Sequence, residues 1–348
     1  MVAGSDDLQV TRPSSVARLR REVVRVIGDI LPPGEPPALL DFPAYGNVGD
    51  SAIWLGELAC LEALGCPEPS YTCDLGTYDR DTLARRVAGG PIWFSGGGNF
   101  GDLYPLHQRF REQVVADFPR NPIVQLPCSI HFQDRRALDR ARRIYGRHPE
   151  MTLLARDEVS REVMRAEFGN RVALCPDMAL CLATRSLRSR RTPNDDVLWL
   201  LRGDDEGRSE PGGGVRDAPP ADWTAEPRPW WKWVRRAGEW LAGGSTAGVV
   251  RRTVSATYPL LARKRVTAGV RLLSSARVIV TDRLHGHILC LLLGIPHVLL
   301  DTRHGKNSSY FQTWTSDHPG AHLADSKPAA GEIAAALLGS LPDRTSCA

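Results

Sequence analysis

Residues 91–102 read Pro-Ile-Trp-Phe-Ser-Gly-Gly-Gly-Asn-Phe-Gly-Asp, an apolar run that ends in a glycine-rich turn, and a helical pattern follows over residues 105–117. The same order of apolar run, polar turn and helical pattern recurs through the first half of the chain. The other apolar runs are Ala38–Phe42, Pro122–Leu126, Met151–Ala155 and Val172–Cys175, and the other helical patterns lie near 51–64, 133–145 and 157–168. This alternation predicts a parallel sheet with helices on both faces.

A second series of such units fills the last part of the chain. Its predicted elements are a strand over Val197–Leu201, a helix over 259–275, a strand over Val278–Thr281, a helix near 284–293, a strand over His297–Asp301 and a closing helix over Ala329–Leu341. The polar, charged sequence over 183–195 is typical of a linker. We therefore expect an α/β protein of two domains, residues 1–185 and 186–348, with a cleft between them.

Three further segments lie outside these units. Residues 16–30 have the apolar spacing of an amphipathic helix with arginines on the opposite side, which predicts a helix docked on the first domain. Residues 203–229 are rich in glycine, proline and charge and predict a long loop. The tryptophans that follow, at positions 230, 231, 233 and 240, either pack in the core or stack on a sugar.

The composition of the 348 residues is that of a soluble globular protein, with 42% hydrophobic and 24% charged residues. A net charge of +4 is too small to indicate a nucleic-acid partner, but it suits an acidic ligand and leaves open a peripheral association with an anionic membrane surface. The eight cysteines form no C-x-x-C pair and no secretory signal is visible, so we expect reduced thiols and a cytoplasmic location. The sequence contains no convincing cluster of metal ligands.

The turns after the predicted strands carry the candidate functional residues, because ligands of open α/β sheets bind at the carboxyl ends of the strands. The first turn, Tyr45–Ser51, contains Asn47 and Gly49, where the backbone can approach a ligand closely. It also contains Asp50, which either caps the next helix or acts in the site.

The glycine-rich turn Ser95–Asp102 is the second candidate. Gly97, Gly98 and Asn99 would present backbone N–H groups to an anion or a sugar. The turn also fits the dinucleotide-binding pattern G-x-G-x-x-G, but it does not lie in the first unit, and Asp102 would repel a pyrophosphate. We therefore expect these glycines to bind a different ligand.

The third turn, Thr281–His287, gives the sharpest prediction. Arg283 is a fixed cation and His285 a titratable imidazole, and both lie at the start of a helix, whose N-terminus attracts anions. This combination suits an anionic substrate that carries carboxylate and phosphate groups. The alternative is that Arg283 only pairs with Asp282 or Asp177.

Two more cations follow predicted strands and could join the same anion site. Arg156 comes directly after Met151–Ala155, and Lys306 follows the strand over His297–Asp301. His304 lies in the same turn as Lys306 and is equally consistent with a solvated loop.

Together these motifs resemble those of the polysaccharide pyruvyl transferase family, in family order from about residue 38 to residue 315. The matching stretches are Gly46–Asp50, Ser95–Tyr104, Pro127–Ile130, Ala155–Asp157 with Ser160, Pro176–Ala179, Thr281–His287, Leu293–Pro296 and Gly305–Lys306. One departure is Cys128, where many members of the family have glutamine.

The resemblance implies a fold like that of the GT-B glycosyltransferases, with two Rossmann-like domains. It also implies transfer of pyruvate from phosphoenolpyruvate to two hydroxyls of a sugar in a glycan or glycan precursor, as a ketal, with release of phosphate. Phosphoenolpyruvate is then a substrate, and no cofactor or metal is expected. The R-L-H motif that the family uses for phosphoenolpyruvate falls on Arg283, Leu284 and His285.

These residues fit what ketal formation requires. His285 could donate a proton, because an imidazole titrates near neutral pH. Asp50 or Asp102, from the other half of the chain, could accept a hydroxyl proton or hydrogen-bond the sugar. Lys306 and the two arginines already named would hold the carboxylate and the phosphate.

Two other functions stay open at this point. A GT-B-type glycosyltransferase that uses a nucleotide sugar would explain the fold and the glycine turns, but not so clearly the pairing of Arg283 with His285. A non-catalytic glycan-binding protein would explain the shape alone. The acceptor sugar of the pyruvyl transferase could be nucleotide-linked, lipid-linked or part of a polymer.

Overall fold

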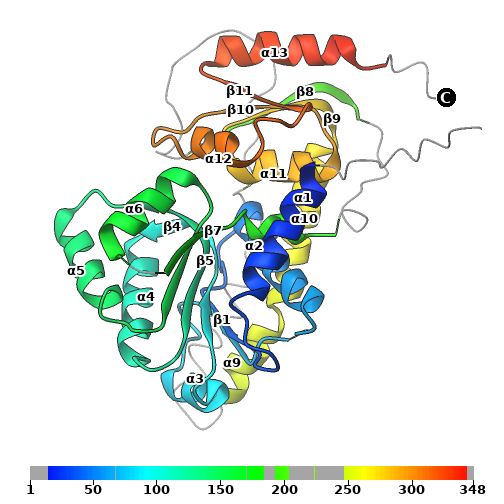
Figure 1. Ribbon diagram of the computed structural model, residues 1–348. Helices are drawn as coiled ribbons and strands as arrows, with labels where there is room; N and C mark the ends of the chain where they lie inside the picture. The colour runs from blue at the N-terminus through cyan, green and yellow to red at the C-terminus, as the bar shows by residue number, and fades with distance from the viewer. Residues whose placement is uncertain are drawn as a thin grey trace, which may run out of the picture.

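The computed structural model of the chain describes residues 15–66, 68–169, 171–183, 193–203, 223 and 247–342. They form two parallel sheets with helices packed on their faces (Figure 1). The tryptophan cluster at 230–240 lies outside the described residues, as do the predicted loop, apart from residues 203 and 223, and most of the predicted linker.

The first sheet has seven strands, all of them parallel. They are β1 (Ala38–Leu40), β2 (Tyr71–Cys73), β3 (Ile92–Phe94), β4 (Gly97–Gly101), β5 (Ile123–His131), β6 (Met151–Ala155) and β7 (Arg171–Leu174). Their order is β2-β1-β3-β5-β6-β7, with β4 beside β5. The order reverses between β1 and β3, and a reversal of this kind marks where ligands bind in doubly wound sheets.

Helices cover both faces of this sheet because successive side chains of a strand point to opposite faces. Leu39 and Trp93 belong to the core under one set of helices, and Leu40 and Phe94 to the core under the other. The first set is α1 (Ser15–Gly28), α2 (Val48–Ala63) and the short 3₁₀ helix η1 (Met178–Cys181). The second set is α3 (Arg80–Val87), α4 (Pro105–Asp117), α5 (Arg135–Tyr145) and α6 (Glu158–Phe168).

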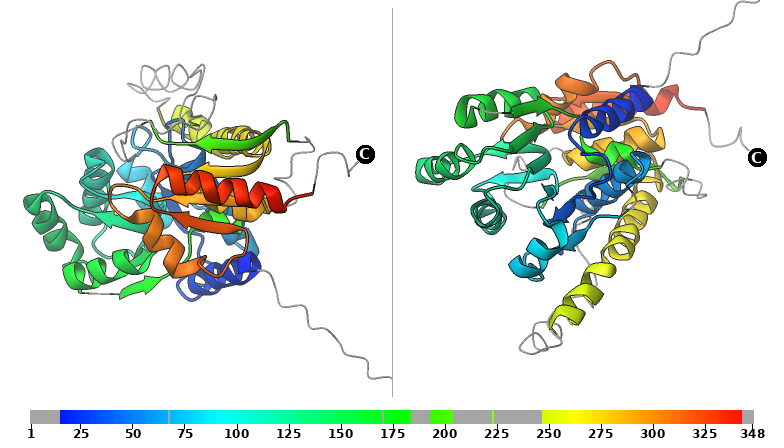
Figure 2. Two further views of the ribbon diagram at one scale, coloured as in Figure 1. Left: turned by 90° about the horizontal axis from the view of Figure 1, so that it is seen from above. Right: turned by 60° about the horizontal axis from the view of Figure 1, so that its bottom comes forward.

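The second sheet has four parallel strands in the order β11-β10-β9-β8. They are β8 (Asp195–Leu200), β9 (Ala276–Thr281), β10 (His297–Leu300) and β11 (Ala321–Ala324). Its helices are α9 (Ala247–Ala256), α10 (Tyr258–Leu273), α11 (Leu284–Leu293), α12 (Lys306–Trp314) and α13 (Lys327–Ser340). Helix α13 lies along one face, and α11 and α12 lie on the other (Figures 1 and 2). None of the described helices is both long and apolar enough to cross a membrane.

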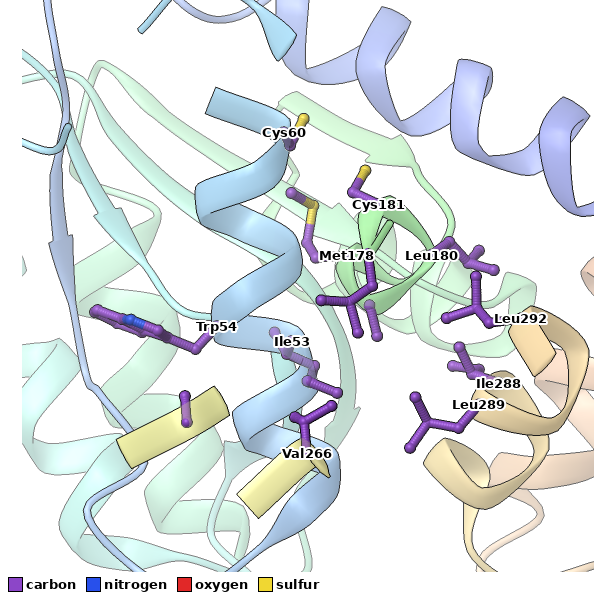
Figure 3. Packing of buried hydrophobic residues seen from close by; sticks show 14 of the residues in the cluster. Ile53, Trp54, Cys60, Met178, Leu180, Cys181, Val266, Ile288, Leu289 and Leu292 are labelled. Atoms are coloured by element: carbon purple, nitrogen blue, oxygen red, sulfur yellow. The ribbon is translucent and has the colours of Figure 1, made fainter. Parts of the chain in front are cut away.

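One hydrophobic cluster connects the helices of both sheets. It contains Ile53 of α2, Met178 of η1, Val266 of α10 and Ile288 of α11, all buried (Figure 3). Helices of the two sheets approach closely where they cross, since a side chain at Gly269 of α10 would collide with the side chain of Val48 of α2. The two sheets are therefore joined through a shared apolar core instead of separate ones.

The predicted elements are confirmed for most of the chain, and two predictions were wrong. The predicted turn Ser95–Asp102 contains the short strand β4, and the strand predicted to end at Leu126 continues to His131 as β5. Gly101 allows this pairing because its φ is +121° and a Cβ there would collide with the carbonyl of His131. The sequence pattern also missed β2, α3, η1, α9, α12 and β11. The predicted boundary at residues 185 and 186 lies outside the described residues.

Two fully buried histidines connect α11 to β10. Nδ1 of His287 lies 2.7 Å from Nε2 of His297, Nε2 of His287 lies 3.0 Å from the Thr315 hydroxyl, and Nδ1 of His297 lies 2.8 Å from the carbonyl of Ile295. When both rings are neutral, the two imidazoles, the Thr315 hydroxyl and the Ile295 carbonyl all have hydrogen-bond partners. Burial lowers the pKa of His287 well below its usual value and lowers that of His297 to about 4.

We predict that replacing His297 by Leu removes a pH-dependent part of the stability. A lowered folded pKa means that the unfolded chain binds more protons between pH 6.5 and about 4, so the contribution of neutral His297 is lost as the pH falls through this range. The stability gap between wild type and His297→Leu should shrink by about 3 kcal/mol from pH 7 to pH 4. Urea unfolding across this range measures the gap, and a constant gap would contradict the assignment.

Candidate active site

A small pocket lies where the carboxyl ends of strands from both sheets meet. Its volume is about 100 Å³. The lining residues from the first half are Tyr45, Asn47, Asp50, Gly98, Asn99, Tyr104 and Arg156. Those from the second half are Arg202, Trp223, Arg283, Leu284, His285, Thr302, Lys306 and Asn307. The turns after β1 and β3, which flank the reversal of strand order, both contribute.

The turn after β1 brings the start of α2 against His285. Asn47 is the N-cap of α2, and its side chain accepts a hydrogen bond of 2.8 Å from the Gly49 N–H. A Cβ at Gly49 would lie closer to Nδ1 of His285 than two such atoms can approach. Glycine is therefore required here because the imidazole from the other half packs on the backbone. Since Asn47 is the cap, the Asp50 side chain is available to line the pocket.

The glycine-rich segment Ser95–Asp102, which follows β3, is hydrogen-bonded to a buried glutamate of α2. Glu57 of α2 accepts hydrogen bonds from the Ser95 hydroxyl at 3.0 and 3.1 Å and from the Gly96 N–H at 2.8 Å. Burial raises the pKa of Glu57 to about 8, although these hydrogen bonds oppose the rise. Glu57 is thus mostly protonated at neutral pH. Gly97, with φ of +119°, lies beside Asp50, and Gly98 lies against the guanidinium of Arg156.

A buried carboxylate links Arg156 to His285. Oδ2 of Asp177 lies 3.0 Å from Nη1 of Arg156 and 3.3 Å from Nε2 of His285. Burial would raise the pKa of Asp177, but His285, Arg156 and the Ala179 N–H outweigh it and lower the pKa to about 2. Asp177 therefore stays ionised and fixes the orientation of the imidazole. Arg156 also donates from Nε to the Ser129 hydroxyl at 2.8 Å.

The turns after β9 and β10 bring two more predicted cations to the pocket. Arg283 is the N-cap residue of α11 and is only 4% exposed, and Lys306 is the first residue of α12. The side-chain amide of Asn307 donates to the carbonyls of Asp282, at 2.7 Å, and Leu300, at 2.8 Å, so it fixes one turn against the other.

The two carboxylates predicted as alternative partners of Arg283 have other hydrogen-bond partners as well. Asp282 accepts a hydrogen bond of 2.8 Å from the backbone N–H of Arg202, and Asp177 binds Arg156 and His285. Burial raises the pKa of Asp282, although that hydrogen bond and the nearby arginines oppose the rise.

Most residues predicted for the site lie in or beside the pocket, but Asp102 does not. Its carboxylate accepts hydrogen bonds from the backbone N–H groups of Gln133, at 2.8 and 2.9 Å, and Asp134, at 2.6 Å. This arrangement holds the loop before α5. Of the two carboxylates predicted to serve the acceptor, the one that lines the pocket is Asp50. His304 does not line the pocket and stacks on His131 instead, with ring centroids 4.3 Å apart.

Several residues around the pocket were missed by reasoning from the sequence. Arg202 follows β8 as Arg283 follows β9, and its place after a strand was a usable signal. Asp177 was considered only as a partner of Arg283, and Glu57, inside a helix, gave no signal. No group of three His, Cys, Asp or Glu side chains suited to a metal ion occurs in the described part of the chain.

The sequence of the chain is similar to those of known proteins. The family model for polysaccharide pyruvyl transferase matches residues 47–304. The chain is 35% identical over 289 residues to pyruvyl transferase 1 of Schizosaccharomyces pombe, covering 80% of this chain and 69% of that protein. It is 31% identical over 305 residues to EpsO of Bacillus subtilis, covering 85% and 90%.

A solved structure has the same fold. It is a crystal structure of an uncharacterized protein of Klebsiella pneumoniae, with a TM-score of 0.57 and 14% identity over 89% of this chain and 98% of that one. At this identity the likeness concerns the fold alone. The family model and the two relatives decide the classification, and the chain belongs to the polysaccharide pyruvyl transferase family, whose members are transferase enzymes.

Proposed function

We propose that this enzyme moves pyruvate from phosphoenolpyruvate onto two hydroxyls of a sugar in a glycan or glycan precursor, forms a ketal and releases phosphate. The observation that carries the proposal is the charge of the pocket, which is lined by Arg156, Arg202, Arg283 and Lys306 and, among the described residues, by the single carboxylate of Asp50. Such a set of cations suits a small donor with a carboxylate and a phosphate.

The size of the pocket supports a small donor. Pockets for drug-sized ligands measure roughly 300–1,000 Å³, and this one measures about 100 Å³. A three-carbon phosphate ester fits this space better than a nucleotide sugar does. The glycosyltransferase alternative loses support from the family.

The geometry suggests how the reaction proceeds. The methylene carbon of the donor must gain a proton, and His285, held by the ionised Asp177, is positioned to supply it. Arg283 and Lys306 would bind the donor's anionic groups and stabilise charge on the leaving phosphate. Arg156, which is paired with Asp177, contributes less charge than an isolated arginine and mainly fixes the carboxylate that orients His285.

The acceptor sugar is best placed on the side of the first sheet. Tyr45 and Tyr104 line the pocket there and are 38% and 39% exposed, so an apolar face of a sugar can stack on either ring. Asp50 lies beside them and can hydrogen-bond a hydroxyl. We place the reaction in the cytoplasm. The acceptor sugar is linked to a nucleotide, to a lipid or to a polymer.

Incubation with phosphoenolpyruvate and a panel of methyl hexosides tests the proposal. We expect release of inorganic phosphate that depends on the acceptor, together with a new ketal methyl signal in the NMR spectrum. Release of a nucleoside diphosphate from a nucleotide sugar, with no consumption of phosphoenolpyruvate, would identify a glycosyltransferase instead.

Replacing His285 by Gln should lower kcat by about 10²–10⁴-fold, the usual loss on removal of a general acid. Phosphate release at saturating phosphoenolpyruvate measures this. His322→Gln, on strand β11 and away from the pocket, is the matched control and should keep wild-type kcat. A His285→Gln enzyme that works at the wild-type rate would remove His285 from the mechanism.

Replacing Arg283 by Lys should raise the KM for phosphoenolpyruvate by about 10-fold or more, because an ammonium cannot reproduce the two parallel hydrogen bonds of a guanidinium. Initial rates over a range of donor concentrations measure the effect. Arg277→Lys, at the other end of the same strand, where Arg277 donates to the carbonyl of Pro342, is the control. An unchanged KM would rule out a two-point contact.

Replacing Gly49 by Ala should lower kcat without unfolding the protein, because the new methyl group pushes the imidazole of His285 away from Asp177. Turnover and circular dichroism together measure this. Gly339→Ala, in a helix where a Cβ meets nothing within 4 Å, is the control and should leave turnover unchanged. Full activity of Gly49→Ala would show that the contact with His285 has no role in turnover.

A further inference from the structure

A second buried carboxylate lies at the end of β1, on the side where the acceptor is proposed to bind. Asp41 has a φ of +71°, and its side chain is fully buried. Few residues other than glycine adopt this conformation, which costs roughly 1–3 kcal/mol and concentrates at functional sites. The strained backbone fixes the direction in which the carboxylate points.

The two oxygens of Asp41 have different partners. Oδ2 accepts a hydrogen bond of 3.1 Å from Nη2 of Arg111, which is also fully buried, and Oδ1 lies 2.7 Å from Nδ1 of His107. Because Arg111 already balances the charge of the carboxylate, His107 can be neutral. A neutral ring donates Nδ1–H to Asp41 and keeps the lone pair of Nε2, the form that a general base requires.

His107 lies beside the residues that line the pocket. It belongs to the first turn of α4, three positions after the N-cap residue Tyr104. Its ring meets that of Tyr45 edge to face, with centroids 5.8 Å apart. Its side chain is 13% exposed, and none of the described residues hydrogen-bonds its Nε2. Arg111 also donates to the carbonyl of Asn99 at 3.0 Å and to its side-chain oxygen, so the same group fixes the glycine turn.

The arrangement repeats the one around His285. The same grouping occurs twice, in that a fully buried aspartate binds a buried arginine and a partly exposed histidine: Asp177 with Arg156 and His285, and Asp41 with Arg111 and His107. Carboxylate–imidazole pairs of this kind hold the imidazole in one orientation for proton transfer. Ketal formation needs one group that gives a proton and another that takes one.

We propose that His107 is the general base that takes the proton of the first acceptor hydroxyl, with Asp41 as its positioning residue; this rests on the proposed function. As the hydroxyl oxygen bonds to the central carbon of the donor, its proton moves to Nε2 of His107 and the methylene carbon gains a proton from His285. When the second hydroxyl bonds to the same carbon, the bond to the phosphate oxygen breaks and the phosphate leaves with that hydroxyl's proton. Solvent returns the proton from His107 to His285.

The test compares wild type, His107→Gln and His107→Ala in the assay with phosphoenolpyruvate and the methyl hexoside that gives the most ketal. His107→Gln should lower kcat by about 10²–10⁴-fold with little change in the KM for phosphoenolpyruvate. The fall in kcat at acidic pH that a base causes should disappear. Added imidazole should restore part of the activity of His107→Ala, which a purely structural role would not allow.

Controls separate the ways in which the proposal can fail. His322→Gln should behave as wild type, and unfolding midpoints should show that the His107 variants are folded. Wild-type kcat and an unchanged pH profile in His107→Gln would overturn the proposal, as would a pH profile that changes in Asp50→Asn and not in His107→Gln. If the wild-type enzyme forms no ketal, the proposed function itself is wrong, and the assignment of His107 as its general base is wrong with it.

A change at Asp41 tests the positioning role separately. Asp41→Asn keeps a residue that tolerates a positive φ, but its amide can offer an N–H to Nδ1 of His107 and so favour the other tautomer. We expect kcat to fall while the KM for phosphoenolpyruvate stays near the wild-type value. Equal activity of Asp41→Asn and wild type would show that the carboxylate does not orient the base.

Discussion

The carboxylate of Asp177 is the interaction on which the candidate site depends. A buried charge is costly unless it is paired and hydrogen-bonded, and here one oxygen faces both Arg156, from the end of β6, and His285, from the start of α11. The two side chains come from different sheets and meet at this one carboxylate. The turns after β1 and β3 then close around the histidine, and Gly49 has no side chain because the ring occupies the space.

The sequence predicted the units of the fold well where local pattern decides them. Apolar runs such as Met151–Ala155 became strands with the same bounds, and the helix predicted near 284–293 is α11, Leu284–Leu293. The ordered motifs also resembled those of the family to which the chain belongs. Turns after successive strands converge at one edge of a parallel sheet, so their polar residues are candidates for one site. Arg283, His285 and Asp50 could be named as candidates for the same reason.

The features of the fold and of the site that could not be predicted from the sequence depend on contacts between residues far apart in the chain. The Gly97–Gly101 stretch is rich in glycine and has the pattern of a turn, yet it pairs with β5 because Gly101 fits against His131. Asp102 was predicted for catalysis, but it binds backbone N–H groups about 30 positions away. Asp41 and Arg111, 70 positions apart, form a buried ion pair that no local pattern reveals.

The apolar cluster shared by α2, η1, α10 and α11 restricts how the molecule can move. Interfaces between domains normally allow relative motion unless they are large and hydrophobic. Swinging the sheets apart would expose Ile53, Met178 and Val266 to water, at a cost of about 1.5–3 kcal/mol for each large aliphatic side chain. Substrates therefore enter and products depart through small movements of turns and side chains, without a hinge rotation of half the molecule.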